Sequence, residues 1–246
     1  MKEKFGQLNA RTLTASAVMT ALLIAVQFAF GFVSGVELVT VFLLSFCYAF
    51  GALAGVLTAL SFSLLRCFLY GFYPNVLLLY LLYYPIFALC FGLMGSKSKP
   101  LPVWVCPLLL TGLAAFCGYF AAAGVKVSAL YQTKISVMLW VLFAILCALS
   151  ALYFIVLLKG GKREREGREL ASVTALAAFF TVCFTLADDV ISPLWYGYSA
   201  QAAIAYFYTG FLAMIPQTVC TAVSVFLLFF PLKKVFFSAA KRELVF

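Results

Sequence analysis

Four ionisable residues lie inside long apolar runs of the sequence: Glu37, Arg66, Asp188 and Asp189. A charge at the centre of a membrane costs at least about 2.5–3.5 kcal/mol, so such residues usually pair with one another or line a polar cavity. Counting about 1.5 Å per residue along each predicted helix places all four in the outer half of a bilayer. Two interpretations are open. In the structural one, Glu37 pairs with Arg66 and the aspartates cap a helix end; in the functional one, all four line an outward-facing cavity.

Aromatic and amide side chains are concentrated beside these charges, at Asn75, Trp195, Tyr206 and Gln217 among others. Aromatic residues also form belts at membrane interfaces, so their position beside uncompensated carboxylates is the informative feature. Pro216 interrupts the last apolar run, and a proline frees backbone carbonyl groups that can face a cavity. The predicted site therefore suits a small solute with a cationic or multi-donor group and a flat moiety.

The composition indicates the class of protein in which these side chains are positioned. Of the 246 residues, 66% are hydrophobic and only 10% are charged, whereas soluble domains are about 25% charged. The chain is therefore predicted to be an integral membrane protein. Histidine is absent, which excludes histidine-based metal sites and catalysis, and no metal site or cofactor is expected. The eight cysteines form no C-x-x-C pair and are expected to be small apolar side chains.

Eight continuous apolar runs predict an all-α bundle of about eight transmembrane helices. None shows the period-2 alternation of a membrane β-barrel. The runs are Leu13–Phe32, Val36–Phe50, Ala52–Gly71, Val76–Gly95, Val103–Gly124, Ile135–Leu158, Ala171–Ile191 and Ala203–Pro231.

The basic residues predict the orientation of this bundle. Most of them fall in residues 1–12, 96–102, 159–170 and 232–246. Eight spans with both termini in the cytoplasm place all four segments inside, as the positive-inside rule requires. The net charge of +9 is then explained by orientation and contact with anionic lipid, and no nucleic-acid partner is expected. A cleaved signal peptide is the alternative for the first run, which is longer than a typical signal sequence.

The first run also carries a stripe of small residues, Ala17, Ala21, Ala25 and Ala29, at a spacing of four. Such a stripe lets another helix approach closely within a membrane. It predicts either internal packing against a neighbouring span or a docking face for a separate membrane subunit.

Several short segments, in this order, resemble the substrate-binding (S) components of energy-coupling factor (ECF) transporters. They are the stripe Ala17-x-x-x-Ala21-x-x-x-Ala25, residues 36–42, 50–55 and 64–71, the Ala187-Asp188-Asp189-Val190 segment and residues 230–234. The resemblance covers about residues 10–95 and 171–235. Residues 51–55 lack the basic residue that is often found at this turn, and the family usually has six spans, so 103–158 is interpreted as an inserted hairpin.

The resemblance implies a single transmembrane domain, residues 1–246, in a prokaryotic cell membrane. Such a protein captures a vitamin-like solute from outside and has no catalytic activity. Its partners are a transmembrane coupling subunit and two cytoplasmic ATPases, and Ala17, Ala21 and Ala25 would be the docking residues. The expected substrate-binding residues are Glu37, Arg66, Asn75, Asp188, Asp189, Trp195, Tyr206 and Gln217.

Two other functions fit parts of the sequence. A standalone secondary transporter would show inverted repeats, and no convincing repeat is present. A membrane enzyme would use Asp188 and Asp189 as metal ligands or as an acid–base pair. Because adjacent helical residues point about 100° apart, the two carboxylates converge only if the helix ends there, and Ser192-Pro193 suggests such an end.

Overall fold

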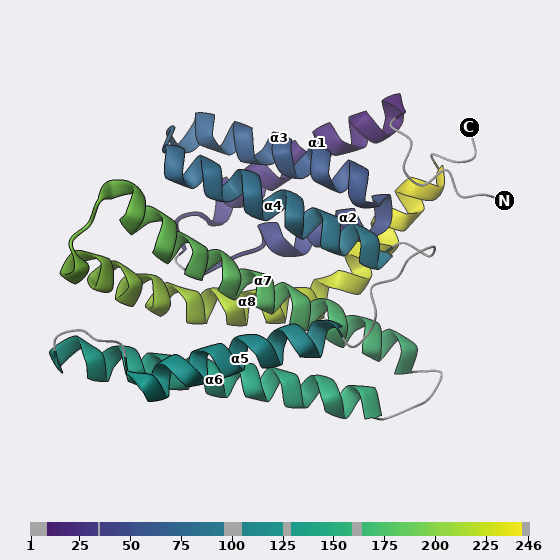
Figure 1. Ribbon diagram of the computed structural model, residues 1–246. Coiled ribbons are helices and arrows are strands. Elements are labelled where there is room, and N and C mark those ends of the chain that lie inside the picture. Colours follow the sequence, from purple (N-terminus) through teal and green to yellow (C-terminus); the bar gives the residue numbers. More distant parts are fainter. Residues whose placement is uncertain (1–8, 34, 96–104, 125–128, 159–163, 243–246) are drawn as a thin grey trace. The chain divides into compact units, whose positions relative to one another are not determined.

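The computed structural model describes residues 9–33, 35–95, 105–124, 129–158 and 164–242, and the regular structure in these ranges is entirely α-helical (Figure 1). The helices are α1 Ala10–Phe30, α2 Val39–Phe50, α3 Ala52–Tyr70, α4 Pro74–Gly95, α5 Val105–Ala123, α6 Ala129–Leu158, α7 Glu164–Tyr196 and α8 Ala200–Arg242. The predicted all-α class is confirmed for the described residues.

Six of these helices are long and apolar enough to cross a membrane: α1, α3, α4, α6, α7 and α8. The apolar parts of α2 and α5 are shorter than the roughly 20 residues that a perpendicular span requires. These features are consistent with a multi-pass membrane protein. Much of the predicted cytoplasmic charge, at residues 1–8, 96–102, 159–163 and 243–246, lies outside the described residues.

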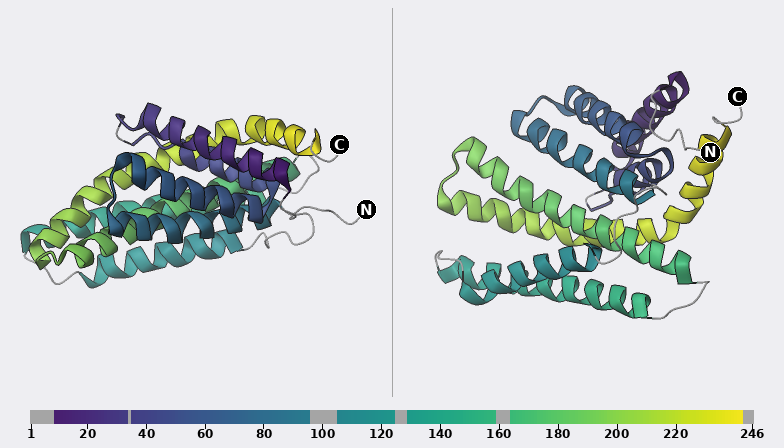
Figure 2. Two further views of the ribbon diagram at one scale, coloured as in Figure 1. Left: turned by 90° about the horizontal axis from the view of Figure 1, so that it is seen from above. Right: turned by 45° about the vertical axis from the view of Figure 1, so that its right-hand side comes forward.

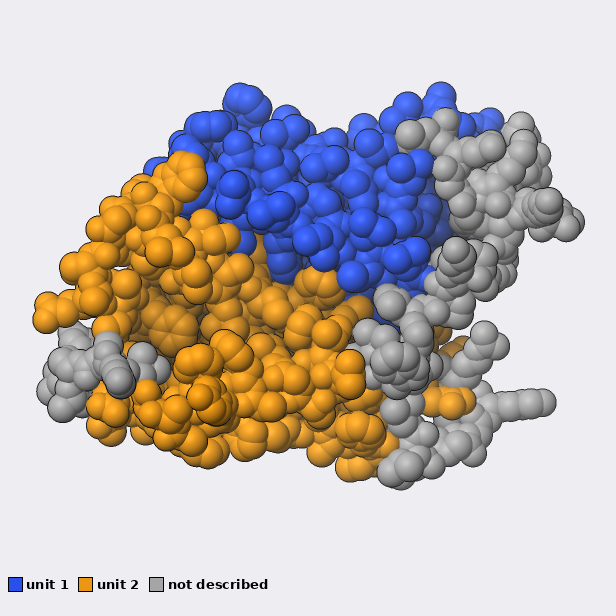
Figure 3. Space-filling view, in the orientation of Figure 1, with its two compact units in different colours: residues 1–101, 223–246 blue, residues 102–222 orange. Residues whose placement is uncertain are grey.

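The chain divides into two compact units (Figure 3). Unit 1 comprises residues 1–101 and 223–246, and unit 2 comprises residues 102–222. The hairpin expected at 103–158 corresponds to α5 and α6, which lie within unit 2 together with α7 and the first part of α8.

In unit 1, α3 and α4 lie side by side, α2 packs on both, and α1 packs on α3 and α2 (Figure 2). The fully buried rings of Phe46, Phe62, Phe87 and Phe91 fill the space between them. Aromatic side chains of this size contribute most of the contact area in such a core.

Two glycines let α4 approach its neighbours closely. A Cβ atom at Gly92 would overlap the backbone of Ala52, at the start of α3, and one at Gly95 would overlap the carbonyl group of Tyr48. Small residues at helix contacts are how membrane helices gain packing energy without a hydrophobic driving force.

In unit 2, α5 and α6 pack against each other, and α7 contacts both. Ala121, Ile135 and Leu139 form a buried cluster there, and Ile204 and Phe207 of α8 pack against it. Among the described cysteines of both units, seven are free, in line with their expected role as apolar side chains, although Cys147 is exposed.

Two predicted boundaries are wrong. The second helix begins at Val39 rather than Val36, so Glu37 precedes the helix instead of lying along it. The seventh helix runs from Glu164 to Tyr196 and passes through Pro193, where an end was expected. A proline inside a helix lacks an N–H donor and crowds the preceding turn, yet α7 continues for three residues beyond Pro193. After that end, the Tyr198 amide donates a hydrogen bond to the Pro193 carbonyl group at 3.0 Å.

The last helix is also continuous. The sequence predicts an interruption at Pro216-Gln217, but residues 200–242 are helical throughout. Pro216 therefore does not end the helix, although it lacks the N–H group that would bind the Leu212 carbonyl in a regular helix.

Replacing Gly92 with alanine should destabilise unit 1 by about 1–3 kcal/mol, because the added methyl group forces α3 and α4 apart. The matched control is Gly112→Ala on α5, where a Cβ atom meets nothing within 4 Å. That control should be neutral or stabilising by up to about 1 kcal/mol. Thermal unfolding in detergent measures both; equal midpoints for the two variants would contradict the close approach.

Candidate functional site

Glu37 binds the start of α2. Its Oε1 atom accepts hydrogen bonds from the backbone amide and the hydroxyl of Thr40, both at 3.2 Å. The first amides of a helix lack intrahelical partners, and the helix dipole favours a negative charge there.

Arg66 of α3 lies between aromatic rings. Its guanidinium carbon is 4.2 Å from the centroid of the Tyr80 ring and 5.5 Å from that of Tyr70. Its charge also acts on Glu37, so the two residues expected at one level do interact electrostatically. A cation over an aromatic face gains about 0.5–2 kcal/mol, depending on how far it is removed from water.

The Tyr80 hydroxyl extends this cluster to α1. The side chains of Gln27 and Tyr84 both hydrogen-bond to it, and the Phe62 ring lies 5.3 Å from the Tyr84 ring. The cluster thus joins α1, α3, α4 and the connection before α2 around one negative and one positive charge. This balanced arrangement favours the structural interpretation for Glu37 and Arg66.

A second group of polar side chains lies in unit 2, where α7 and α8 face each other. Both oxygens of the Asp188 carboxylate are hydrogen-bonded. The Ser192 hydroxyl donates to Oδ1 at 2.7 Å, and the Tyr206 hydroxyl donates to Oδ2 at 2.9 Å. These contacts fix Asp188 in place, and no positive partner for its charge is found among the residues that the structure describes.

Asp189 is in a different environment. Its side chain is only 6% exposed, and both carboxylate oxygens are inaccessible to water and without a hydrogen-bond partner. The carboxylate lies against α8 at Gly210, where a Cβ atom would overlap it. Within the described part of the chain, neither aspartate has an ion-pair partner. A buried carboxylate in this state is costly unless a proton or cation compensates it.

A row of tyrosine rings leads from this acidic pair to the surface. The centroid of the Tyr206 ring is 6.0 Å from that of Tyr198, which is 5.9 Å from that of Tyr196. Gly197, with a φ angle of +61°, allows the tight connection that holds Tyr198 between the helices. Tyr196 is 48% exposed and Tyr198 is 42% exposed, so these rings lie at the surface of the unit.

The structure brings only some of the predicted residues together. Asp188 and Tyr206 are bonded to each other, and Asp189 lies next to them. Trp195 is 54% exposed near the end of α7, and Gln217 is half-buried further along α8, with no described hydrogen bond to this cluster. In unit 1, Asn75 is buried in the first turn of α4.

The expectation that the aspartates cap a helix end is wrong, because α7 continues through Tyr196. This also removes the geometric condition for the enzyme hypothesis. On a continuous helix the two carboxylates diverge, with Asp188 bonded to Tyr206 and Asp189 packed on Gly210.

Sequence reasoning missed Ser192, Gly210, Gln27 and Tyr80. Ser192 is four residues after Asp188, a spacing that places two side chains on one helix face, so this contact was open to prediction. Gly210 and Gln27 each meet their partner on a different helix, and nothing in a single sequence indicates which helices pair.

The alanine stripe of α1 is not covered by another helix. Ala17, Ala21, Ala25 and Ala29 are all exposed. The sequence allowed two predictions for this stripe, internal packing or docking of a separate subunit. The described structure does not show the internal packing.

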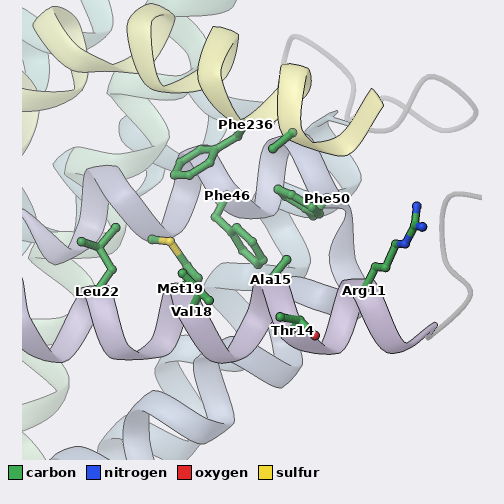
Figure 4. Close-up of a pocket in the computed structure, with 10 residues that line it drawn as sticks. Arg11, Thr14, Ala15, Val18, Met19, Leu22, Phe46, Phe50 and Phe236 are labelled. Carbon is green, nitrogen blue, oxygen red and sulfur yellow. The ribbon is translucent and has the colours of Figure 1, made fainter. Parts of the chain in front are cut away.

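An apolar groove of about 450 Å³ runs along α1 beside this stripe (Figure 4). Side chains of α1, α2 and the end of α8 surround it, among them Arg11, Val18, Met19, Phe46, Phe50 and Phe236. None of the predicted substrate-binding residues lines it.

The helices and their hydropathy define the class: an α-helical protein with six described helices able to cross a membrane. Comparison with known proteins identifies no relative: no family model, no curated protein and no solved structure matches the chain. The site must therefore be interpreted from its own residues.

Two substitutions of Tyr80 should distinguish the contribution of its ring from that of its hydroxyl group. Tyr80→Phe keeps the ring under Arg66 but loses the hydroxyl that Gln27 and Tyr84 bind. Tyr80→Leu loses both, and should cost a further 0.5–2 kcal/mol, roughly, in stability. Thermal unfolding of the purified chain measures the difference, and identical midpoints for the two variants would show that the ring does not hold Arg66.

Proposed function

We propose that the chain is the substrate-binding (S) component of an ECF-type importer. It captures a vitamin-like micronutrient outside a prokaryotic cell. It then releases the solute inward after docking on a transmembrane coupling subunit that two cytoplasmic ATPases drive. The proposal includes eight membrane-crossing segments with both termini in the cytoplasm.

The acidic pair of unit 2 carries this proposal. Two carboxylates without a positive partner among the described residues are expensive within apolar helices. A structural pair would have a counter-charge, as Glu37 has in Arg66. Exposed tyrosine rings next to Asp188 give a solute both access and a contact surface. These features support solute binding at Asp188, Asp189 and Tyr206.

The surface of α1 supports the docking part of the proposal. An exposed row of alanines gives a flat strip that another helix can approach closely. The adjoining groove has room for larger side chains of such a partner. A membrane subunit has no hydrophobic gain on leaving lipid, so close packing of this kind is what would hold it.

The docking face is tested by enlarging the stripe. Ala17→Leu with Ala21→Leu should abolish co-purification of the co-expressed coupling subunit and ATPases, because the added side chains keep the partner helix away. The matched control is Ala144→Leu with Ala148→Leu, an exposed alanine pair at the same spacing on α6. It should leave the complex intact.

Two outcomes would count against docking through α1. One is a complex that survives the Ala17/Ala21 change, and the other is equal loss with the Ala144/Ala148 control. A wild-type chain that never co-purifies with the ATPases would contradict the importer assignment as a whole.

Solute capture is tested by mass spectrometry of small molecules that co-purify with the chain. A molecule present with the wild type should be lost with Asp188→Asn, which removes the charge of the half-buried carboxylate that Tyr206 binds. It should be retained with Glu166→Gln, an exposed carboxylate elsewhere on α7. Retention of the molecule by Asp188→Asn would place the solute at another part of the protein.

A further inference from the structure

The acidic site of unit 2 carries more negative charge than the described residues around it compensate. Asp188 receives two hydrogen bonds from neutral hydroxyl groups, and Asp189 receives none. Lys134, on α6, is directed elsewhere: its ammonium group lies 5.9 Å from the centroid of the Tyr208 ring. Hydroxyl donors orient a carboxylate but leave its full charge, so the site attracts a cation.

The two aspartates have different exposure, which gives the site a direction. Asp189 is closed off against Gly210, whereas Asp188 is half-buried and bonded to Tyr206. The exposed Tyr198 ring lies 6.0 Å from the Tyr206 ring, whose hydroxyl group donates to Asp188, so the rings connect the surface of the unit with this carboxylate. The unpartnered Asp189 carboxyl group is buried next to this contact, against Gly210.

Tyrosine rings select among cations. Ring faces attract weakly hydrated organic ammonium groups, and such sites commonly combine several rings with a carboxylate. A bare inorganic cation instead requires several oxygen ligands, which a ring face does not supply. Tyr196, Tyr198 and Tyr206 form a continuous row of rings beside Asp188.

We propose that Asp188, Asp189 and the tyrosine row form a binding site for an organic ammonium group. This inference rests on the proposed function and gives the chemical class of the captured solute. The ammonium group contacts the Asp188 carboxylate and the faces of Tyr206 and Tyr198. Asp189 is the buried carboxyl group of the site, and neither of its oxygens has a hydrogen-bond partner.

Ammonium ions that contain only the recognised group provide the test. The thermal unfolding midpoint of the full chain in detergent is measured with tetramethylammonium chloride or methylammonium chloride, against sodium chloride at equal concentration. The ammonium salts should raise the midpoint by roughly 2–4 °C at several times their dissociation constant. Asp188→Asn should abolish this rise, and Glu166→Gln should leave it unchanged.

A variant pair at Tyr198 keeps the test valid if Asp188→Asn does not fold. Tyr198 lies in an exposed connection, where substitutions are well tolerated. Tyr198→Phe should keep the affinity for tetramethylammonium, while Tyr198→Leu should weaken it about fivefold because the ring face is lost.

Three results would overturn the proposal: an equal rise with sodium chloride, a rise that persists in Asp188→Asn, or a Tyr198→Leu affinity equal to that of wild type. These measurements use the chain alone. If the ammonium response is absent but the Ala17/Ala21 change still abolishes the ATPase complex, the solute class is wrong and the importer assignment stands.

Discussion

The structure depends on how a nearly uncharged helical chain accommodates its few ionic side chains. Each must find a counter-charge, hydrogen bonds or a ligand, because an apolar environment gives no solvation. Unit 1 solves this internally: Glu37 binds the start of α2, and Arg66 lies over the Tyr80 ring within reach of the Glu37 charge. In unit 2 the ionic side chains are only partly satisfied, because Asp188 is hydrogen-bonded and Asp189 is not.

This contrast separates the two polar clusters by role. The Glu37–Arg66 pair brings opposite charges together between several helices, although the Arg66 Nε atom and the Gln27 Oε1 atom of this cluster are buried without a hydrogen-bond partner. An uncompensated pair beside exposed rings has the opposite character, because a bound cation would improve its electrostatics. The same reasoning applies to α1, whose alanine stripe is exposed although small residues in membranes gain energy only by packing.

Much of the fold could be predicted from the sequence, because apolar runs of sufficient length leave helices as the available structure. Counting residues back from the turn at Gly51 placed Glu37 and Arg66 at one level, and the Arg66 charge does act on Glu37, although Glu37 precedes α2 rather than lying along it. The helix ends were less predictable: polar residues extended α7 before Ala171, and Pro193 and Pro216 did not end their helices. The contact of Asp189 with Gly210 could not be predicted, since it depends on how two helices face each other.

The central claim is that the acidic pair of unit 2 exists to hold a cationic solute. An experimental density map of the chain, purified from its cells with the solute retained, tests this most directly. The account predicts non-protein density in contact with the Asp188 carboxylate and the Tyr198 ring. A map in which a basic side chain of the protein itself pairs with Asp188 and Asp189, with no additional density, would contradict it.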